Sequence, residues 1–136
     1  MKLRIKGDSL RIRVSRSEVA RLLAGERIED TIHFASQENA KLTYALEHHA
    51  SGTAPTVHYA DGNVTICIPT AQAIPWCNTD QVGIAETISV GSAGSLDLLI
   101  EKDFACLDRS DEDNLDTFTN PNAAATCQPR DLISNG

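Results

Sequence analysis

The feature that most constrains the fold is a match of the sequence to itself at an offset of fifty-four residues. Without a gap, residues 2–48 fall on residues 56–102, and apolar positions fall on apolar positions. The matched pairs include Leu3 with Val57, Leu10 with Val64, Ile12 with Ile66, Leu22 with Trp76, Phe34 with Ile88 and Leu46 with Ile100. Self-similarity at a fixed period is the signature of an internal repeat. We therefore expect two copies of one unit, residues 1–54 and 55–107, in a single domain over residues 1–107.

Alternating apolar residues predict that each unit begins with a β-hairpin. The alternation runs through residues 3–5 and 10–14 in the first unit, and a period of two is typical of half-buried strands. In the second unit, Asp61-Gly62 separates the corresponding runs and favours a two-residue hairpin turn. Gly7-Asp8 holds this place in the first unit. A two-residue turn places Arg4 opposite Arg11, because it preserves the side-chain parity of both strands.

A short helix and two more strands complete each unit. Ser15 and Glu18 form a capping box before the first helix, and Gly25 provides its stop signal. Pro69 is the expected first residue of the second helix. The remaining strands are predicted at residues 27–34 and 41–47, and again at 81–89 and 95–101. The fold class is thus α+β, mostly β, built from two β-β-α-β-β repeats.

Charge is divided unevenly along the chain. The net charge is −7, but residues 1–27 hold eight basic residues against three acidic ones, a balance of +5. The remainder of the chain therefore carries −12. Such asymmetry predicts a basic surface in the first unit and an acidic end with a different role.

The basic surface is predicted to be one face of the first hairpin. Strand parity directs five cationic side chains to that face, and Arg16 follows at the start of the helix; the candidate DNA-binding or anion-binding residues are Lys2, Arg4, Lys6, Arg11, Arg13 and Arg16. Like charges directly opposite on paired strands destabilise a sheet. Either carboxylates from a neighbouring strand or from the acidic end neutralise this face, or it binds DNA phosphates.

The string from Leu3 to Val14 resembles the start of AbrB/MazE swapped-hairpin domains, and Ile66-x-Ile68-Pro69 resembles their helix entry. The resemblance implies a closed pseudo-two-fold swapped-hairpin β-barrel made by a single chain, a monomeric pseudo-dimer, with DNA contacted through the basic hairpin. The second unit departs from the family pattern, because neutral residues replace the cations: Thr56, His58, Ala60, Thr65 and Cys67.

Residues 108–136 are predicted to be an acidic, disordered tail or a solvated wrap. It could instead dock on the basic hairpin. The resemblance implies a third role, since MazE-like antitoxins bind their basic toxins through acidic C-terminal tails. The candidate protein-binding residues are Asp111, Glu112, Asp113, Leu115 and Phe118.

Several classes of function are not indicated. No nucleophile–base grouping, phosphate-binding loop or metal-spaced cluster occurs, so we expect no enzyme activity, no cofactor and no metal. His58 and Cys67 are expected near each other across the second hairpin, but they supply just two metal ligands. His48 and His49 should point to opposite faces of a strand. The four cysteines are predicted to be reduced thiols.

No apolar run reaches membrane-spanning length and no secretory segment follows Met1, so a cytoplasmic location is expected. The leading hypothesis is an AbrB/MazE-like DNA-binding regulator or antitoxin. The alternative is a protein-interaction module that does not bind DNA.

Overall fold

The computed structural model describes residues 1–104 and 116–118. The described residues form eight strands, two α-helices and one 3-10 turn, η1. In chain order these are β1 (Lys2–Lys6), β2 (Ser9–Val14), α1 (Arg16–Leu23), β3 (Ile28–His33), β4 (Lys41–His49), β5 (Thr56–Ala60), β6 (Asn63–Pro69), α2 (Thr70–Asn78), β7 (Gly83–Ser89), η1 (Gly91–Ala93) and β8 (Ser95–Lys102). The prediction of an α+β fold, mostly β, is confirmed in this coarse form.

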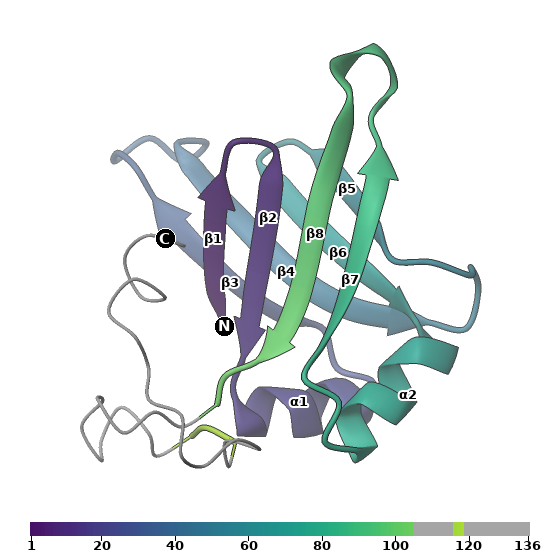
Figure 1. Cartoon of the computed structure of the whole chain (residues 1–136). Helices are drawn as coiled ribbons and strands as arrows, with labels where there is room; N and C mark the ends of the chain where they lie inside the picture. The colour runs from purple at the N-terminus through teal and green to yellow at the C-terminus, as the bar shows by residue number, and fades with distance from the viewer. Residues whose placement is uncertain (105–115, 119–136) are drawn as a thin grey trace.

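The strands form two four-stranded sheets, in the orders β1-β2-β8-β7 and β3-β4-β6-β5. Each sheet combines one hairpin from the first half of the chain with one from the second half. The central pairs, β2 with β8 and β4 with β6, are parallel, whereas the outer pairs are antiparallel. In Figure 1 one sheet lies in front of the other, and both helices lie together beneath them.

No hydrogen-bonded ladder joins the two sheets within the described strands. β1 and β7 are the edges of one sheet, and β3 and β5 are the edges of the other. The predicted single closed barrel is therefore replaced, in the described residues, by two separate sheets. No described helix has the length and apolar character needed to cross a membrane.

The hairpin registers follow from the turns. Lys6 pairs with Ser9 and Arg4 with Arg11, as the two-residue turn predicts. In the second hairpin Asp61 and Gly62 both have positive φ, 50° and 76°, as a primed two-residue turn requires. These registers confirm the predicted strand parity.

The helix ends are also set locally. At the start of α1, the Ser15 hydroxyl accepts from the Glu18 backbone N–H, and the Glu18 carboxylate accepts from the Ser15 N–H at 2.9 Å. The predicted capping box is thereby confirmed. Pro69 is the N-cap of α2 and the helix begins at Thr70, one residue later than predicted.

The core lies between the two sheets and the helices. Its side chains come from alternate positions of the central strands and from one face of each helix: Leu10, Ile12, Val14, Val19, Leu22, Ile28, Leu46, Ile66, Ile68, Ala73, Trp76, Ile84, Leu98 and Ile100. Trp76 is fully buried and donates its Nε1–H to the carbonyl of Val82 at 3.2 Å. Because core residues alternate along the strands, the polar positions between them lie on the outer faces of both sheets.

Candidate functional sites on the outer sheet faces

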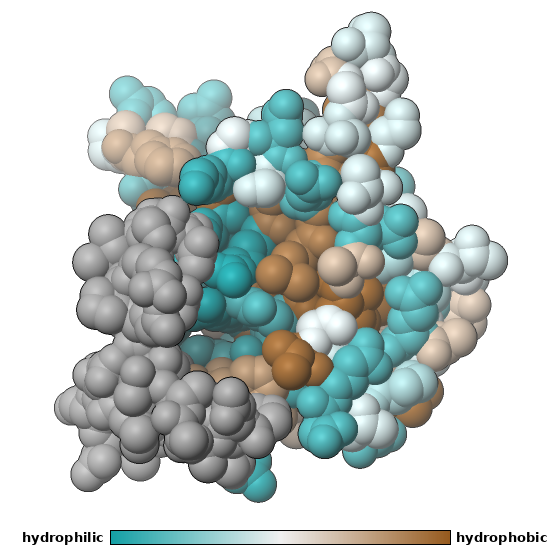
Figure 2. Space-filling view, in the orientation of Figure 1, coloured by the Kyte–Doolittle hydropathy of each residue, from teal (hydrophilic) through white to brown (hydrophobic). Residues whose placement is uncertain are grey.

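The basic face occupies the outer side of the β1–β2 hairpin. Lys2 lies opposite Arg13 and Arg4 opposite Arg11, so the cations gather as the sequence predicts. Figure 2 shows hydrophilic residues over β1 and β2 and apolar residues beside them on the surface, over β8. The face is therefore charged along one edge of its sheet.

Carboxylates from β8 and from the residue after it accompany these cations. Arg13 donates from Nε to Oε1 of Glu101 at 2.7 Å, and Nε of Arg11 lies 2.8 Å from the same oxygen. The parallel pairing of β2 with β8 produces this contact, because it places Arg13 directly opposite Glu101. Lys2 pairs with Asp103 at 3.2 Å. The structure thus places a carboxylate of β8, and one from the residue after it, against three of the predicted DNA-binding residues.

A shallow hollow of about 210 Å³ lies at the turn end of this face. Its lining combines cationic, acidic and apolar residues: Arg4, Lys6, Ser9, Leu10, Arg11, Asp97 and Leu99. Arg16 does not join it. That residue is exposed in the first turn of α1, where its backbone N–H donates to the carbonyl of Asp116 at 3.2 Å.

The described part of the acidic end contacts the domain beside this face. The Asp116 carboxylate accepts from the backbone N–H of Ser17 at 2.9 Å and from its hydroxyl at 2.5 Å. These bonds from Ser17 outweigh the effect of burial and lower the pKa of Asp116. The negative charge of Asp116 at the N-terminus of α1 also interacts favourably with the positive end of the helix dipole.

Phe118 packs against the chain's own core. Its backbone N–H donates to the carbonyl of Asp103 at 2.9 Å, and its ring meets Phe104 edge-on with centroids 6.0 Å apart. Its predicted role as an anchor for a partner stays a prediction. The other four candidate protein-binding residues lie outside the described residues; they are Asp111, Glu112, Asp113 and Leu115. Most of the predicted tail and its boundary at residue 107 lie outside them as well.

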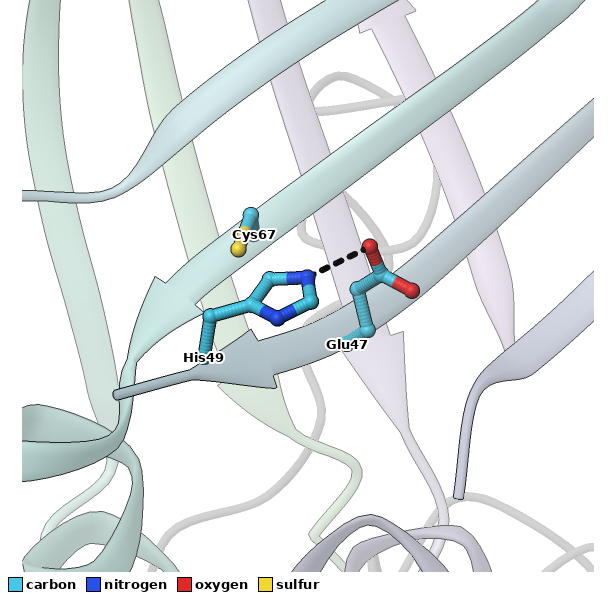
Figure 3. A group of neighbouring side chains, drawn as sticks. All are labelled: Glu47, His49 and Cys67. Atoms are coloured by element: carbon cyan, nitrogen blue, oxygen red, sulfur yellow. Dashed lines mark hydrogen bonds and ion pairs between the residues drawn. The ribbon is translucent and has the colours of Figure 1, made fainter. Parts of the chain in front are cut away.

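A different group of side chains meets on the outer face of the second sheet. Glu47 and His49 lie two residues apart on β4 and therefore share a face, and Cys67 lies directly opposite Glu47 on β6. His49 Nε2 is 2.9 Å from Glu47 Oε1. The sulfur, one imidazole nitrogen and one carboxylate oxygen all lie within 4.8 Å of one another. Figure 3 shows the three side chains converging across the two strands.

Arg27 contacts the Glu47 carboxylate oxygen that does not face His49. Its Nη1 donates to Glu47 Oε2 at 3.1 Å, and its Nη2 donates to the Thr65 hydroxyl at 3.2 Å. The hydrogen bond from His49, followed by the contacts with Arg27, lowers the pKa of Glu47. Burial, with a smaller contribution from Glu47, raises the pKa of the Cys67 thiol.

The sequence indicated a different neighbour for Cys67. His58 pairs with Thr65 across the β5–β6 hairpin and is absent from the three-residue group, whereas Glu47 and His49 belong to it. The overlooked signal in the sequence is that Glu47 and His49, two residues apart on one strand, point to the same face. As predicted, His48 points the other way, with its ring nitrogens 2.8 Å from the Thr70 hydroxyl and 2.9 Å from the Leu22 carbonyl.

Two cysteines, Cys67 and Cys77, lie in the described residues, and both are free thiols. Cys106 and Cys127 lie outside the described residues. The prediction of reduced thiols therefore holds for the described pair.

Comparison with known proteins gives one match. The model of a family described as "Family of unknown function (DUF7009)" matches residues 1–122. Neither the curated proteins nor the solved structures gave a match. The matched range contains every described strand and helix, the basic face, the group of Glu47, His49 and Cys67, and the segment that contacts α1.

Proposed function

The chain belongs to DUF7009, a family of unknown function, and on this premise we propose that it is a protein-interaction module for a cationic partner rather than a reader of DNA. One observation carries the choice against DNA. A single carboxylate, Glu101, engages both Arg11 and Arg13 of the basic face. A DNA phosphate would have to compete with that carboxylate for both guanidinium groups.

The charge balance supports a cationic partner. The basic hairpin carries five cations, but Asp97, Glu101 and Asp103 lie among or beside them. The chain as a whole carries −7. Because DNA affinity comes largely from neutralising phosphates and releasing counterions, a locally compensated face on an acidic protein is poorly suited to it. The excess of acidic residues after residue 27 attracts positive charge instead.

Two labelled probes, a DNA duplex and a ten-residue oligolysine peptide, test the choice by fluorescence anisotropy. We expect oligolysine to bind, more weakly as salt rises from about 50 mM to about 200 mM, and DNA to show no binding even at low salt. Asp111→Asn, Glu112→Gln and Asp113→Asn together should weaken peptide binding. The matched triple change Glu29→Gln, Asp30→Asn and Glu38→Gln should weaken it less. Salt-sensitive DNA binding by the wild-type chain would overturn the proposal.

An AbrB/MazE-like DNA-binding regulator or antitoxin is the second candidate. The gathering of five cations on one face of one hairpin favours it, since β-ribbons can enter the major groove. Glu101→Gln distinguishes the candidates further. If Glu101 blocks phosphate binding, the variant gains low-salt DNA affinity that the wild type lacks, whereas a DNA reader binds DNA in both forms.

We propose that the architecture is a swapped-hairpin pseudo-dimer of two repeats. The starts of corresponding elements support this, because four pairs lie fifty-four residues apart and β3 and β7 lie fifty-five apart; the four pairs are β1 and β5, β2 and β6, α1 and α2, and β4 and β8. The sheet orders support it too, since an exchange of corresponding elements converts one order into the other. One chain then supplies both halves, and we expect light scattering after size exclusion to give the monomer mass of 14.7 kDa. A stable dimer would contradict this expectation.

A further inference from the structure

We propose that Glu47, His49 and Cys67 form a binding site for a divalent transition-metal ion of the zinc class. Thiolate, imidazole and carboxylate are the three ligand types that zinc uses in proteins. Their ligand atoms already lie within 4.8 Å of one another. In a tetrahedral zinc site with ordinary bond lengths, neighbouring ligand atoms are about 3.4 to 3.7 Å apart. Small side-chain rotations therefore suffice to close the three ligands on one ion.

The backbone positions these ligands before any ion binds. β4 and β6 are hydrogen-bonded neighbours at the centre of their sheet, and Glu47 and Cys67 are register partners. His49 follows on the same face one alternation further along β4. A site on paired central strands holds its geometry better than one on loops.

Arg27 orients the carboxylate. Its contact with Oε2 leaves Oε1 directed at His49 Nε2, 2.9 Å away. A bound metal ion would replace the hydrogen bond between these two atoms, because each of them would coordinate the ion instead. Outer contacts of this kind orient metal ligands and tune their affinity. The Arg27 charge opposes a cation, but thiolate and carboxylate together neutralise a divalent ion.

The position on the first sheet that corresponds to Glu47 has different neighbours. Glu101 lies fifty-four residues after Glu47, and its register partner is Arg13, whereas the partner of Glu47 is Cys67. On the first sheet the carboxylate thus meets two guanidinium groups from β2, Arg11 and Arg13. On the second sheet β6 presents a hydroxyl and a thiol at the same two places, Thr65 and Cys67. The strand beside Glu47 therefore offers a thiol that can bind a metal where the strand beside Glu101 offers a guanidinium group.

His49 is about half exposed, with a side-chain exposure of 54%, so the site opens toward solvent. Three protein ligands leave the fourth tetrahedral position to water or to a donor from another molecule. The site is independent of the proposed binding of a cationic partner.

Cobalt(II) provides the direct test, because a thiolate bound to it gives a charge-transfer absorption. We expect the reduced full-length chain, freed of metal by a chelator, to bind one equivalent of Co²⁺ with this band and to lose the band when Zn²⁺ is added. Cys67→Ser should abolish the band and Cys77→Ser should retain it. Persistence of the band in the Cys67→Ser variant, or its absence from the wild type, would overturn the proposal.

Further variants guard against other thiols and against unfolding. Cys106→Ser with Cys127→Ser should leave the band intact, and its loss would reassign the site. His49→Gln should weaken Co²⁺ binding by more than the roughly 10- to 100-fold that loss of an outer contact costs, whereas His33→Gln should not. Arg27→Gln should change affinity and keep the band. Equal behaviour of the two histidine variants, with unchanged circular dichroism, would contradict the assignment.

Discussion

Arg13 donates from its Nε to Oε1 of Glu101 at 2.7 Å, although the two residues lie 88 positions apart in the chain. Both side chains are largely shielded from water, with exposures of 20% and 13%. The bond connects the N-terminal hairpin to the last strand of the opposite half. This ion pair thus joins two distant parts of the chain and reduces the positive charge of a face that the sequence predicts to be basic.

Replacing this carboxylate should destabilise the fold. Glu101→Gln removes the charge that balances Arg11 and Arg13, and we expect a loss of about 1 to 3 kcal/mol in the free energy of unfolding. Urea denaturation followed by circular dichroism measures the loss. Glu38→Gln, an exposed change in the β3–β4 connection, is the control. Equal stability of the two variants would show that the ion pairs contribute little.

Trp76 should be among the most sensitive core positions. Trp76→Ala leaves a cavity and removes the donor to the Val82 carbonyl, so we expect a loss of about 3 to 5 kcal/mol. Ile74→Ala on the same helix should cost much less, because Ile74 is exposed. Circular dichroism is the suitable readout, since the variant contains no tryptophan. A similar cost at both positions would contradict the packing of α2.

Lys102 should contribute a rise of stability with pH. Burial is the main influence on its pKa and lowers it, against Cys77 and Asp80, which raise it. The unfolded chain therefore binds this proton more tightly, and stability increases between the folded and the unfolded pKa of the lysine.

Lys102→Met compared in a Cys77→Ser background isolates this contribution, because Lys102 and Cys77 influence each other. Tyr44 and Cys67, whose raised pKa values act in the opposite direction, are the same in both proteins. Near neutral pH the methionine variant avoids burying a charge, and it should be more stable than the lysine form. We expect this difference in the free energy of unfolding to shrink as pH rises toward the ordinary pKa of lysine. Urea titrations across mildly alkaline pH measure it. A constant difference at every pH would exclude the effect.

Asp116 should make stability fall in acid. The pKa of this carboxyl is lowered by Ser17, so its contribution is complete above the ordinary pKa of aspartate and is lost as pH falls through the folded value. Because the group is exposed, solvent screening limits the effect to about 0.5 kcal/mol. Asp116→Asn should lower stability near neutral pH and reduce the difference between pH about 6 and about 3. Asp8→Asn is the control, and the same loss there would argue against a specific contact.

The local parts of the fold could be predicted because they depend on neighbours in sequence. The turn at Gly7-Asp8 fixes the pairing of Arg4 with Arg11, and Ser15 caps α1 together with Glu18. Each of these features involves fewer than ten residues of chain. Turn chemistry, strand parity and capping act over such distances.

The sites could not be read in the same way because their partners come from parallel strands far away in the chain. The sequence shows the cations of β2 but not that Glu101 lies beside them. It suggests His58 as the neighbour of Cys67, because a hairpin joins them, whereas the pairing of β4 with β6 brings Glu47 and His49 to that thiol. A parallel register is decided by the packing of the whole core, so short motifs do not reveal it.

The division of each sheet between the two halves of the chain has a consequence for fragments. A protease that cut between β4 and β5, at the exposed residues around Gly52, would leave pieces that each hold half of both sheets. Neither piece could complete a sheet alone, so folding would become an association of two fragments and would depend on their concentration. The short linker acts as a tether that keeps the effective concentration of each half high for the other.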